Sequence, residues 1–486
     1  MPQHKRTLPM LANAVAAGLF VTLSAHASLQ PVPDAEGLEV IVPAQVSQEG
    51  EALLYQSHVR LSDYAAAQHA VSSVGRIMRS SEMGHSDYAD QLPERAMQRQ
   101  GEIWLQLQNE AIHFVDSGAY SSMRVSDGQW QANEPLALAD LAKATFTYQM
   151  HHSGGRWADY DLDDAITYTP VGYLGNLMRQ LLEQHYQDAY FVDTDGNKNL
   201  ASLAQGLDAL HGLIYAWVRW HKPGGSDDMG RLSEERMEQR LGISQAELLE
   251  LGRSLTATLD QHWSDDLSAY AEEGRADYSL ADFGSLMRGH KGLYELLYIF
   301  GDEDDQASAK ALFERKATML SGLMNSGEVV QDWGVATSFS FTPDGVIATS
   351  DVIDTASQWR FLNHLTGGFG TLRENEGTSG FVNDQPELKA LIADFSDQLL
   401  RGAQDYQSDA DGLVVRQLAL ADGKITDSSH STASIGWYLT AAGYAYRSGD
   451  AFDRPDAWKD DSALAERSRA LYDHILLQNA WLVRHF

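Results

Sequence analysis

Hydrophobic side chains recur at three- and four-residue intervals along most of the chain, which is the spacing of one face of an α-helix. A start signal, Ser244 followed by Glu247, and a stop signal, Gly301 after Phe300, frame two of these stretches. The chain is therefore predicted to be mainly helical. The predicted helices span residues 94–115, 136–149, 172–190, 200–221, 244–263, 280–300, 304–325, 354–366, 386–405, 431–447 and 461–484.

Two segments, 329–348 and 413–420, break the helical pattern and predict β-hairpins, because Asp344-Gly345 and Asp422-Gly423 mark tight turns. Helices that arrive in consecutive pairs favour an antiparallel helix-pair architecture. An elongated array of such pairs should show a fixed repeat period, and the chain shows none. We therefore expect an all-α fold, a closed (α/α) toroid with small β-hairpin insertions.

The first 27 residues read as a secretory signal peptide, with a basic start at Lys5 and Arg6 and an apolar stretch over 8–23. Ala25 and Ala27 stand where a signal peptidase reads small residues. The apolar stretch is shorter than the roughly 20 residues of a membrane span. We expect a periplasmic or secreted protein without a membrane span. Residues 28–50 are predicted to form an extended linker, and residues 51–486 one helical domain.

Composition narrows the possible functions. The chain of 486 residues carries 36 Lys and Arg against 68 Asp and Glu, a net charge of −32. Removing the leader removes two basic residues, so the mature charge is 34 − 68 = −34. Such a surface repels nucleic acid, and we favour adaptation to salty surroundings as its cause. The absence of Cys excludes disulfides and thiolate metal sites.

The densest polar and aromatic segment, 150–179, supplies four candidate site residues. His151 and Tyr160 are candidate catalytic residues, and Arg156 and Trp157 are candidate substrate-binding residues. A His or Tyr base beside an Arg suits β-elimination from a uronate. The other interpretation is a solvated acidic loop whose aromatic side chains pack inward.

A second segment, 331–376, offers carboxylates beside aromatic side chains, the combination that glycosidic hydrolysis uses. Asp332 and Asp354 are the candidate acid and base or nucleophile. Asp354 could equally cap a helix, and one of the aromatic residues, Trp359, could belong to the core. The candidate substrate-binding residues of this segment are Trp333, Trp359 and His364.

Residues 427–433, DSSHSTA, open a helix rich in small and aromatic residues, and residues 288–295, RGHKGLYE, combine charge with glycines that allow close helix packing. Both segments resemble inner helices of (α/α)-toroid carbohydrate-active enzymes such as the unsaturated glucuronyl hydrolases. The resemblance implies that His430 faces a central cavity as a catalytic candidate, with Arg288 as a substrate-binding candidate. It implies no particular substrate.

One stretch, 193–200, has oxygen-bearing side chains at alternate positions, as in the first half of an EF-hand calcium loop. Lys198 stands where the turn needs Gly, and Ala204 where a bidentate Glu is needed. The stretch is either a weak structural Ca²⁺ site or an Asx-rich turn. The candidate metal ligands are Asp193, Asp195, Asn197 and Asn199.

Two functional hypotheses follow. The first is an exported enzyme that acts on a polysaccharide or oligosaccharide and requires no cofactor. Glycoside hydrolysis is preferred over lyase chemistry, because the acidic surface disfavours a polyanionic substrate. The alternative is a non-catalytic exported helical protein with a binding or assembly role.

Overall fold

The structure is a computed structural model. It describes residues 45–49, 52–55, 58–79, 103, 120–126, 129–151, 175, 177–220, 233–366, 385–448 and 462–484. The predicted signal peptide at 1–27 lies outside the described residues, as does the predicted helix 94–115 apart from Ile103.

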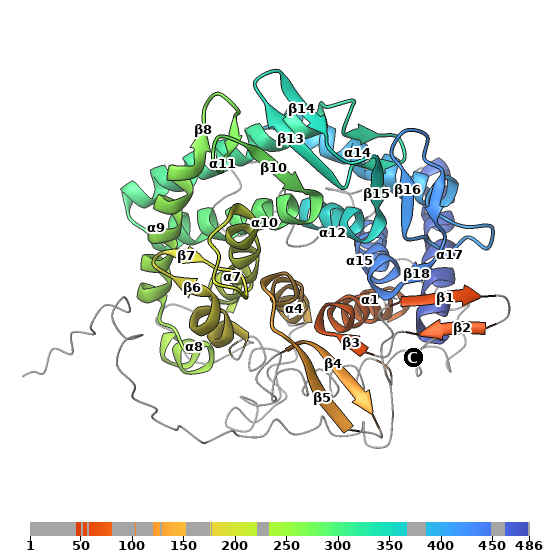
Figure 1. The fold of residues 1–486 in the computed structure, drawn as a ribbon, viewed down its shortest axis with the longest axis horizontal. Helices are drawn as coiled ribbons and strands as arrows, with labels where there is room; N and C mark the ends of the chain where they lie inside the picture. Colours follow the sequence, from red (N-terminus) through yellow and green to blue (C-terminus); the bar gives the residue numbers. More distant parts are fainter. Residues whose placement is uncertain are drawn as a thin grey trace, which may run out of the picture.

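Six helices of the described chain stand side by side in a closed inner ring (Figure 1). Each packs against the next in chain order, and the last packs against the first. The inner helices are α1 (Leu61–Arg79), α4 (Leu138–His151), α7 (Leu200–Trp220), α10 (Leu280–Phe300), α12 (Thr355–Thr366) and α15 (Thr432–Ser448).

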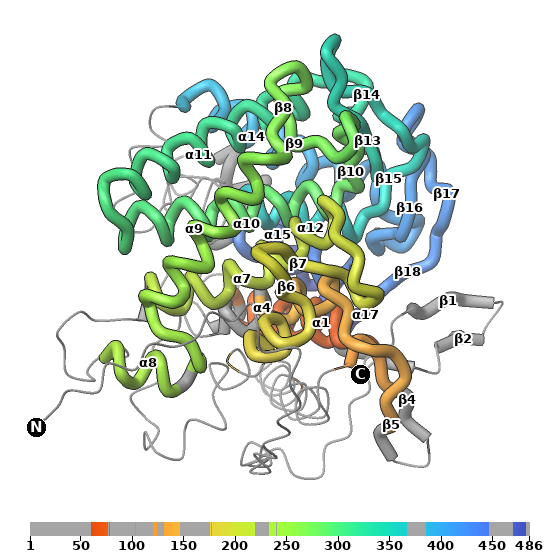
Figure 2. The backbone as a smooth tube through the Cα atoms, turned by 60° about the vertical axis from the view of Figure 1, so that its left-hand side comes forward, coloured from red at the N-terminus to blue at the C-terminus, as the bar shows by residue number. Residues whose placement is uncertain are grey.

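Further helices lie outside this ring, and all but the last of them come between two successive inner helices in the sequence (Figures 1 and 2). Helices α9 and α11 pack on α10, α14 packs on α12, and α17 packs on α15. The outer helices are α8 (Glu234–Leu241), α9 (Gln245–His262), α11 (Glu303–Met324), α14 (Pro386–Asp405) and α17 (Ser462–Arg484).

Small residues bring neighbouring inner helices close together. A Cβ on Gly292 of α10 would lie 3.1 Å from His211 Cβ on α7, and Gly289, one turn earlier, faces Leu207, one turn earlier on α7. The two contacts advance in the same direction along both helices, so α7 and α10 are parallel. The outer helix α9 between them in sequence carries the chain back, which is the helix-hairpin unit of a toroid.

Short antiparallel strands precede each inner helix. Because neighbouring inner helices run parallel, these strands gather where the inner helices begin, which we call the hairpin end. Strands β1 to β7 are Gln45–Glu49, Ala52–Tyr55, His58–Arg60, Tyr120–Ser126, Gln129–Pro135, Tyr186–Gln187 and Tyr190–Phe191. Strands β8 to β14 are Trp263–Ser264, Ala269–Tyr270, Ala276–Ser279, Val330–Gln331, Gly334–Val335, Ser338–Thr342 and Gly345–Ala348. Strands β15 to β18 are Val352–Asp354, Gln417–Ala419, Ile425–Asp427 and His430–Ser431.

The strands form small separate sheets, of which four are three-stranded: β18-β1-β2, β3-β4-β5, β10-β13-β14 and β15-β16-β17. Strand β1 lies within the predicted linker and pairs with β18, with Val46 opposite His430. The first described strand is thereby joined to the last strand before α15.

The predicted all-α toroid with small β-hairpin insertions is confirmed by this closed double ring. The prediction of a helix over 172–190 is wrong at its end, because a π-helical turn, Leu181–His185, leads directly into β6. Asp188 and Ala189 have positive φ angles of 48° and 58° and form the turn between β6 and β7. Helices α1 and α8 were not predicted.

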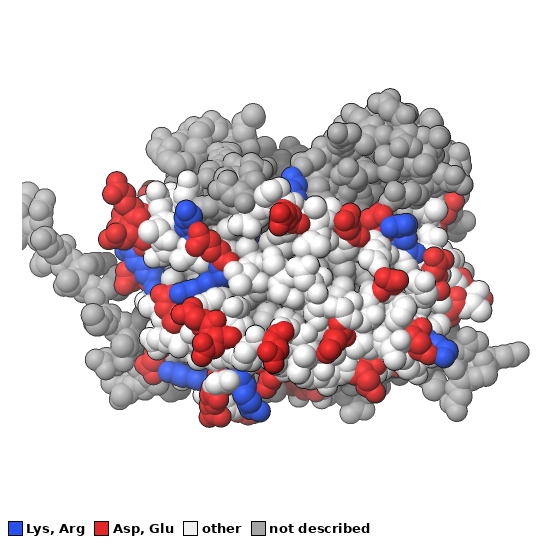
Figure 3. Space-filling model, turned by 90° about the horizontal axis from the view of Figure 1, so that it is seen from above, with Lys and Arg blue, Asp and Glu red and all other residues white. Residues whose placement is uncertain are grey.

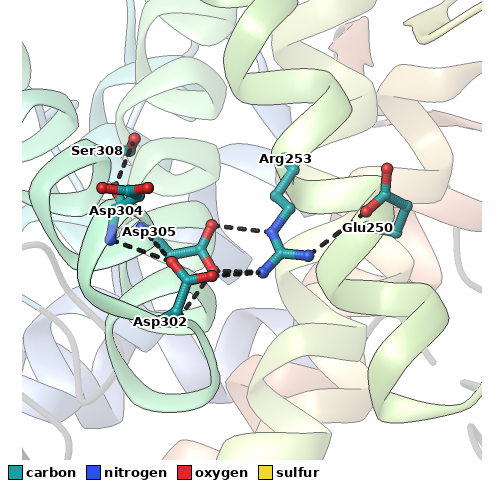
Figure 4. Close-up of polar contacts among 6 residues, drawn as sticks. All are labelled: Glu250, Arg253, Asp302, Asp304, Asp305 and Ser308. Carbon is teal, nitrogen blue, oxygen red and sulfur yellow. Dashed lines mark hydrogen bonds and ion pairs between the residues drawn. The ribbon is translucent and has the colours of Figure 1, made fainter.

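Two polar arrangements fix the outer helices. Ser244 and Glu247 form the capping box at the start of α9. Arg253 on α9 donates from Nε to Asp305 Oδ1 at 2.9 Å, and Asp302 caps α11 by accepting from the backbone N–H of Asp305 (Figure 4). Acidic side chains are more numerous than basic ones on the face of the molecule shown in Figure 3.

Candidate active site

Ionisable side chains form a buried stripe along inner helices α7 and α10. Asp208 and His211 lie one turn apart on α7, and Arg288, Lys291 and Glu295 follow one another at three- and four-residue spacing on α10. The stripe begins about two turns below the hairpin end, at a depth of roughly 12 Å. We call the buried ionisable residues and their serine partner the buried charge cluster: Asp208, His211, Ser285, Arg288, Lys291, Glu295, Lys316, Arg360 and His364.

Asp208 is the centre of one half of this cluster. Its carboxylate accepts hydrogen bonds from Arg288 Nη1 on α10 and from Arg360 Nη2 on α12, in two short ion pairs. It also accepts from Ser285 Oγ at 2.9 Å. Asp208 is 0% exposed and Arg288 1%, whereas Arg360 is 5% exposed. One carboxylate therefore joins three inner helices inside the ring.

The electrostatics of this half set its protonation states. Burial raises the pKa of Asp208, but Arg288 and Arg360 outweigh burial and hold the pKa below its ordinary value. Burial lowers the pKa of Arg288 to about 10. Burial, assisted by Arg360, lowers the pKa of His364 well below 6.5. At neutral pH the half therefore holds an ionised Asp208 carboxylate, a charged Arg288 guanidinium group and a neutral His364 imidazole.

Aromatic and histidine side chains continue the arrangement across the ring. The Arg360 guanidinium carbon lies 6.0 Å from the ring centroid of Trp437 on α15. Trp437 in turn meets His69 of α1 edge to face, with centroids 6.0 Å apart. Side chains from α7, α10, α12, α15 and α1 are thus connected from one helix to the next around the ring.

Two of the predicted substrate-binding residues, Arg288 and His364, are brought together in this half. Trp359 is 0% exposed and meets Tyr438 of α15 edge to face, so it packs in the core. Asp354 accepts from the backbone N–H of Ser357 at 2.8 Å at the start of α12. Its carboxylate therefore takes the helix-capping role that was the alternative interpretation.

The remaining described candidates lie toward the hairpin end and the outer layer. Asp332 accepts from Gln398 Nε2 of outer helix α14 at 2.6 Å. Trp333 donates from Nε1 to the Leu420 carbonyl at 2.8 Å. The structure does not bring either of them to the buried charge cluster.

His430 also lies outside the cluster. Its Nδ1 is 3.0 Å from the Val414 carbonyl, and its Nε2 is 3.2 Å from the Asp409 carboxylate. Its ring meets Trp481 of outer helix α17 edge to face. His151 is the last residue of α4, and nothing is described of its side chain. Arg156, Trp157 and Tyr160 lie outside the described residues.

The predicted calcium loop forms a compact turn. Asp193 Oδ1 accepts from the backbone N–H groups of Asp195 and Asn197, both at 2.9 Å, and Oδ2 accepts from Asn197 Nδ2 at 3.0 Å. Asn199 instead accepts from the backbone of Ser202 at the start of α7. Within the described residues no group of three or more His, Asp or Glu side chains is arranged to hold a metal ion. The calcium site stays a prediction.

Sequence reasoning did not select Asp208, Ser285 or Arg360 as site residues. A signal was present, because Asp208 is an acidic residue in the otherwise strongly apolar segment 200–218. A lone carboxylate in a buried helix needs a basic partner, and Arg288 and Arg360 occupy comparably buried helices. Which inner helices become neighbours was not readable from the sequence.

Comparisons with known proteins place the fold among solved structures only at low similarity. No family model matches the chain, and no curated protein matches it. Similar solved structures include a sugar epimerase from a ruminal bacterium (TM-score 0.47, 9% identity, 82% of this chain and 91% of that chain). They also include cellobiose 2-epimerase from Bacillus thermoamylovorans B4167 (0.45, 9%, 82% and 91%) and a D-mannose isomerase (0.44, 10%, 82% and 90%).

These three proteins are sugar-converting enzymes by name, the broad class that the sequence resemblance implies. At such identities and TM-scores they carry no conclusion about the activity of this chain. Among the described residues, no helix is both long and apolar enough to cross a membrane.

Proposed function

We propose that this protein is an enzyme that acts on a sugar or an oligosaccharide, with its reacting centre at the Asp208 half of the buried charge cluster. The supporting observation is the convergence of Asp208, Arg288, Arg360 and His364 from three inner helices. Buried ion networks are rarely more stable than apolar packing of the same volume. Strongly perturbed titratable groups that cluster in this way mark functional sites.

Proton transfer is the reaction that these groups support best. His364 is a neutral imidazole and can take a proton from a carbon beside a carbonyl or carboxylate group. Arg288 and Arg360 can stabilise the negative charge that then develops on oxygen. Asp208 holds both guanidinium groups in place. Elimination, isomerisation and epimerisation of sugars all use such a step.

Glycoside hydrolysis is the second candidate. It needs two carboxylates at one site, and Glu295 is a second buried carboxylate in the same cluster as Asp208. Of the pair predicted from the sequence, Asp332 contacts Gln398 of α14 and Asp354 caps α12. Hydrolysis at this site would therefore use Glu295 in place of that pair.

The sugar substrate class is supported by the resemblance of residues 288–295 and 427–433 to toroid carbohydrate-active enzymes. Export is part of the same proposal and is supported by the leader-like residues 1–27. The mass of the protein purified from its natural source tests export. A chain that lacks the first 27 residues is expected, and a full-length cell-associated chain would contradict export.

The activity test is a panel of mono-, oligo- and polysaccharides in heavy water. Three readouts run in parallel: deuterium incorporation into sugar carbon, absorbance of unsaturated products and release of reducing ends. The first two report proton transfer and the third reports hydrolysis. Silence in all three readouts across the panel would support the non-catalytic alternative.

The decisive variant is His364→Asn, which keeps a small polar side chain but removes the base. We expect a loss of about 10²-fold or more in kcat. His474→Asn is the matched control, because His474 is also buried, with its Nδ1 against Tyr438 and its Nε2 against the Gly412 carbonyl on the outer layer. Equal losses in the two variants would remove His364 from the proposed site.

A further inference from the structure

An aspartate occupies the same position, the third residue, in three of the inner helices. Asp63 of α1, Asp140 of α4 and Asp282 of α10 each stand two residues after the leucine that opens the helix. Asp282 has its partners, because Oδ1 accepts from Gln205 Nε2 and Oδ2 from Ser279 Oγ, both at 2.6 Å. An acidic residue in a first turn ordinarily stabilises the start of a helix in this way.

Asp63 differs from Asp282 in this respect. Asp63 is 5% exposed, and within the described part of the chain its buried Oδ2 has no hydrogen-bond partner. Asp140 on the adjacent inner helix is 6% exposed, and its charge acts on Asp63. Because α1 and α4 pack side by side and run parallel, the two carboxyl groups are neighbours at the hairpin end (Figure 1). A buried polar atom without a partner is unfavourable, so Asp63 Oδ2 points to a ligand that supplies one.

The surroundings of Asp63 keep a proton on it. Burial raises the pKa of Asp63 to about 7. Lys143 of α4 and Arg60 of β3 oppose this shift, and the neighbouring charge of Asp140 adds to it. Arg60 also forms an ion pair with Glu134 of β5, with Nη2 3.2 Å from Oε2. Near neutral pH about half of the Asp63 side chains are therefore carboxylic acids that can donate a proton.

We propose that the hairpin end between α1 and α4 is a site of glycosidic hydrolysis for neutral oligosaccharides, with Asp63 as the proton donor. The inference rests on the proposed sugar substrate, and it gives hydrolysis a carboxyl pair outside the buried charge cluster. Asp63 gives its proton to the bridging oxygen as the bond between that oxygen and the anomeric carbon breaks. Water attacks the anomeric carbon and loses a proton to Asp140, which returns it to Asp63 through solvent. Asp140 and the ionised form of Asp63 repel carboxylate groups, so the substrate is a neutral sugar.

The first experiment measures the release of reducing ends from neutral oligosaccharides as a function of pH. We expect Asp63→Asn to lower kcat by about 10²-fold or more, and the kcat of the unaltered protein to fall as the pH rises above about 7. Asp282→Asn is the matched control, because Asp282 has the same helix position but caps α10, and it should keep the pH profile. Equal rates for the unaltered protein and Asp63→Asn would overturn this proposal and leave the sugar chemistry at Asp208 standing. No release by the unaltered protein would overturn it too, and deuterium incorporation would still decide proton transfer at Asp208.

The second experiment needs no substrate and follows Tm between pH 5 and pH 8, a range chosen to span the raised pKa of Asp63. The folded chain keeps the Asp63 proton up to about pH 7, whereas the unfolded chain releases it at about pH 4, so stability falls as the pH rises between these values. We expect the Tm of the unaltered protein to fall relative to that of Asp63→Asn by about 1–2 °C per pH unit up to about pH 7. A difference in Tm that does not change with pH would show that Asp63 is ionised throughout, and it would overturn the role of Asp63 as proton donor.

Discussion

The carboxylate of Asp208 should be the most sensitive single group of the ring for stability. Asp208→Asn removes the negative charge but keeps the size of the side chain. Two guanidinium groups, Arg288 and Arg360, then stay buried without their counter-charge. Removing one member of a buried ion network costs about 3–5 kcal/mol, and Asp208 has two cationic partners and Ser285 as a third donor. We expect a loss at the upper part of that range.

The measurement is urea unfolding followed by circular dichroism at neutral pH. Glu314→Gln is the matched control, since Glu314 forms an ion pair with Lys310 on the surface of α11, where about 0.3–0.5 kcal/mol is at stake. Equal unfolding midpoints for Asp208→Asn and Glu314→Gln, with unchanged m values, would refute the reasoning. A triple variant with apolar side chains at Asp208, Arg288 and Arg360 should recover most of the lost stability.

Four further outcomes are expected. Gly289→Ala should cost at least about 1–3 kcal/mol, because the new Cβ would overlap Leu207, whereas Gly327→Ala, with open space around it, should change the free energy of unfolding by less than about 0.5 kcal/mol in the same urea assay. Ser244→Ala should lower the free energy of unfolding by about 1 kcal/mol, because it removes the capping box of α9. An unchanged free energy of unfolding would show that the box does not stabilise the helix. Burial lowers the pKa of His290 to about 3, so the neutral imidazole leaves the free energy of unfolding unaffected above pH 6.5. As the pH drops from 6.5 toward 3, the unfolded chain binds this proton and the folded chain does not, so the free energy of unfolding falls by up to about 1.4 kcal/mol per pH unit. His290→Gln should remove this pH dependence in acid titrations of Tm. A calcium site at Asp195 predicts a rise in Tm that EGTA reverses and that Asp195→Asn removes, and an unchanged Tm would leave only the Asx turn.

The sequence was sufficient for most helices because their apolar periodicity and caps are local properties. Helix α9 has both a stripe of leucines and the Ser244 capping box, and its predicted and observed bounds agree to one residue. Helix α1 was missed because it packs with small residues such as Ala66 and Ala70, which give no strong periodicity. The small-residue face of α1 becomes recognisable only in the structure, where α15 packs closely against it at Gly436.

The candidate site was less predictable for a related reason. Arg288 and His364 are predicted site residues from separate segments, and no local pattern places them at one carboxylate. Asp208 lies 80 positions from Arg288 and 152 from Arg360. Those contacts depend on the closure of the ring. Local signals such as turns and helix caps instead favour candidates at the hairpin end, such as Asp354 and His430.

Closure of the ring at α1 and α15 also constrains how the chain can be made. A Cβ added to Gly436 of α15 would lie 3.0 Å from the backbone of Ala66 on α1. The two residues are 370 positions apart in the sequence. During synthesis, the small-residue face of α1 has no partner on α15 until nearly the whole chain has emerged. Contacts of such long range slow folding. The nascent toroid is therefore an open arc for most of its synthesis, and we expect it to depend on chaperones that hold exposed apolar helix faces.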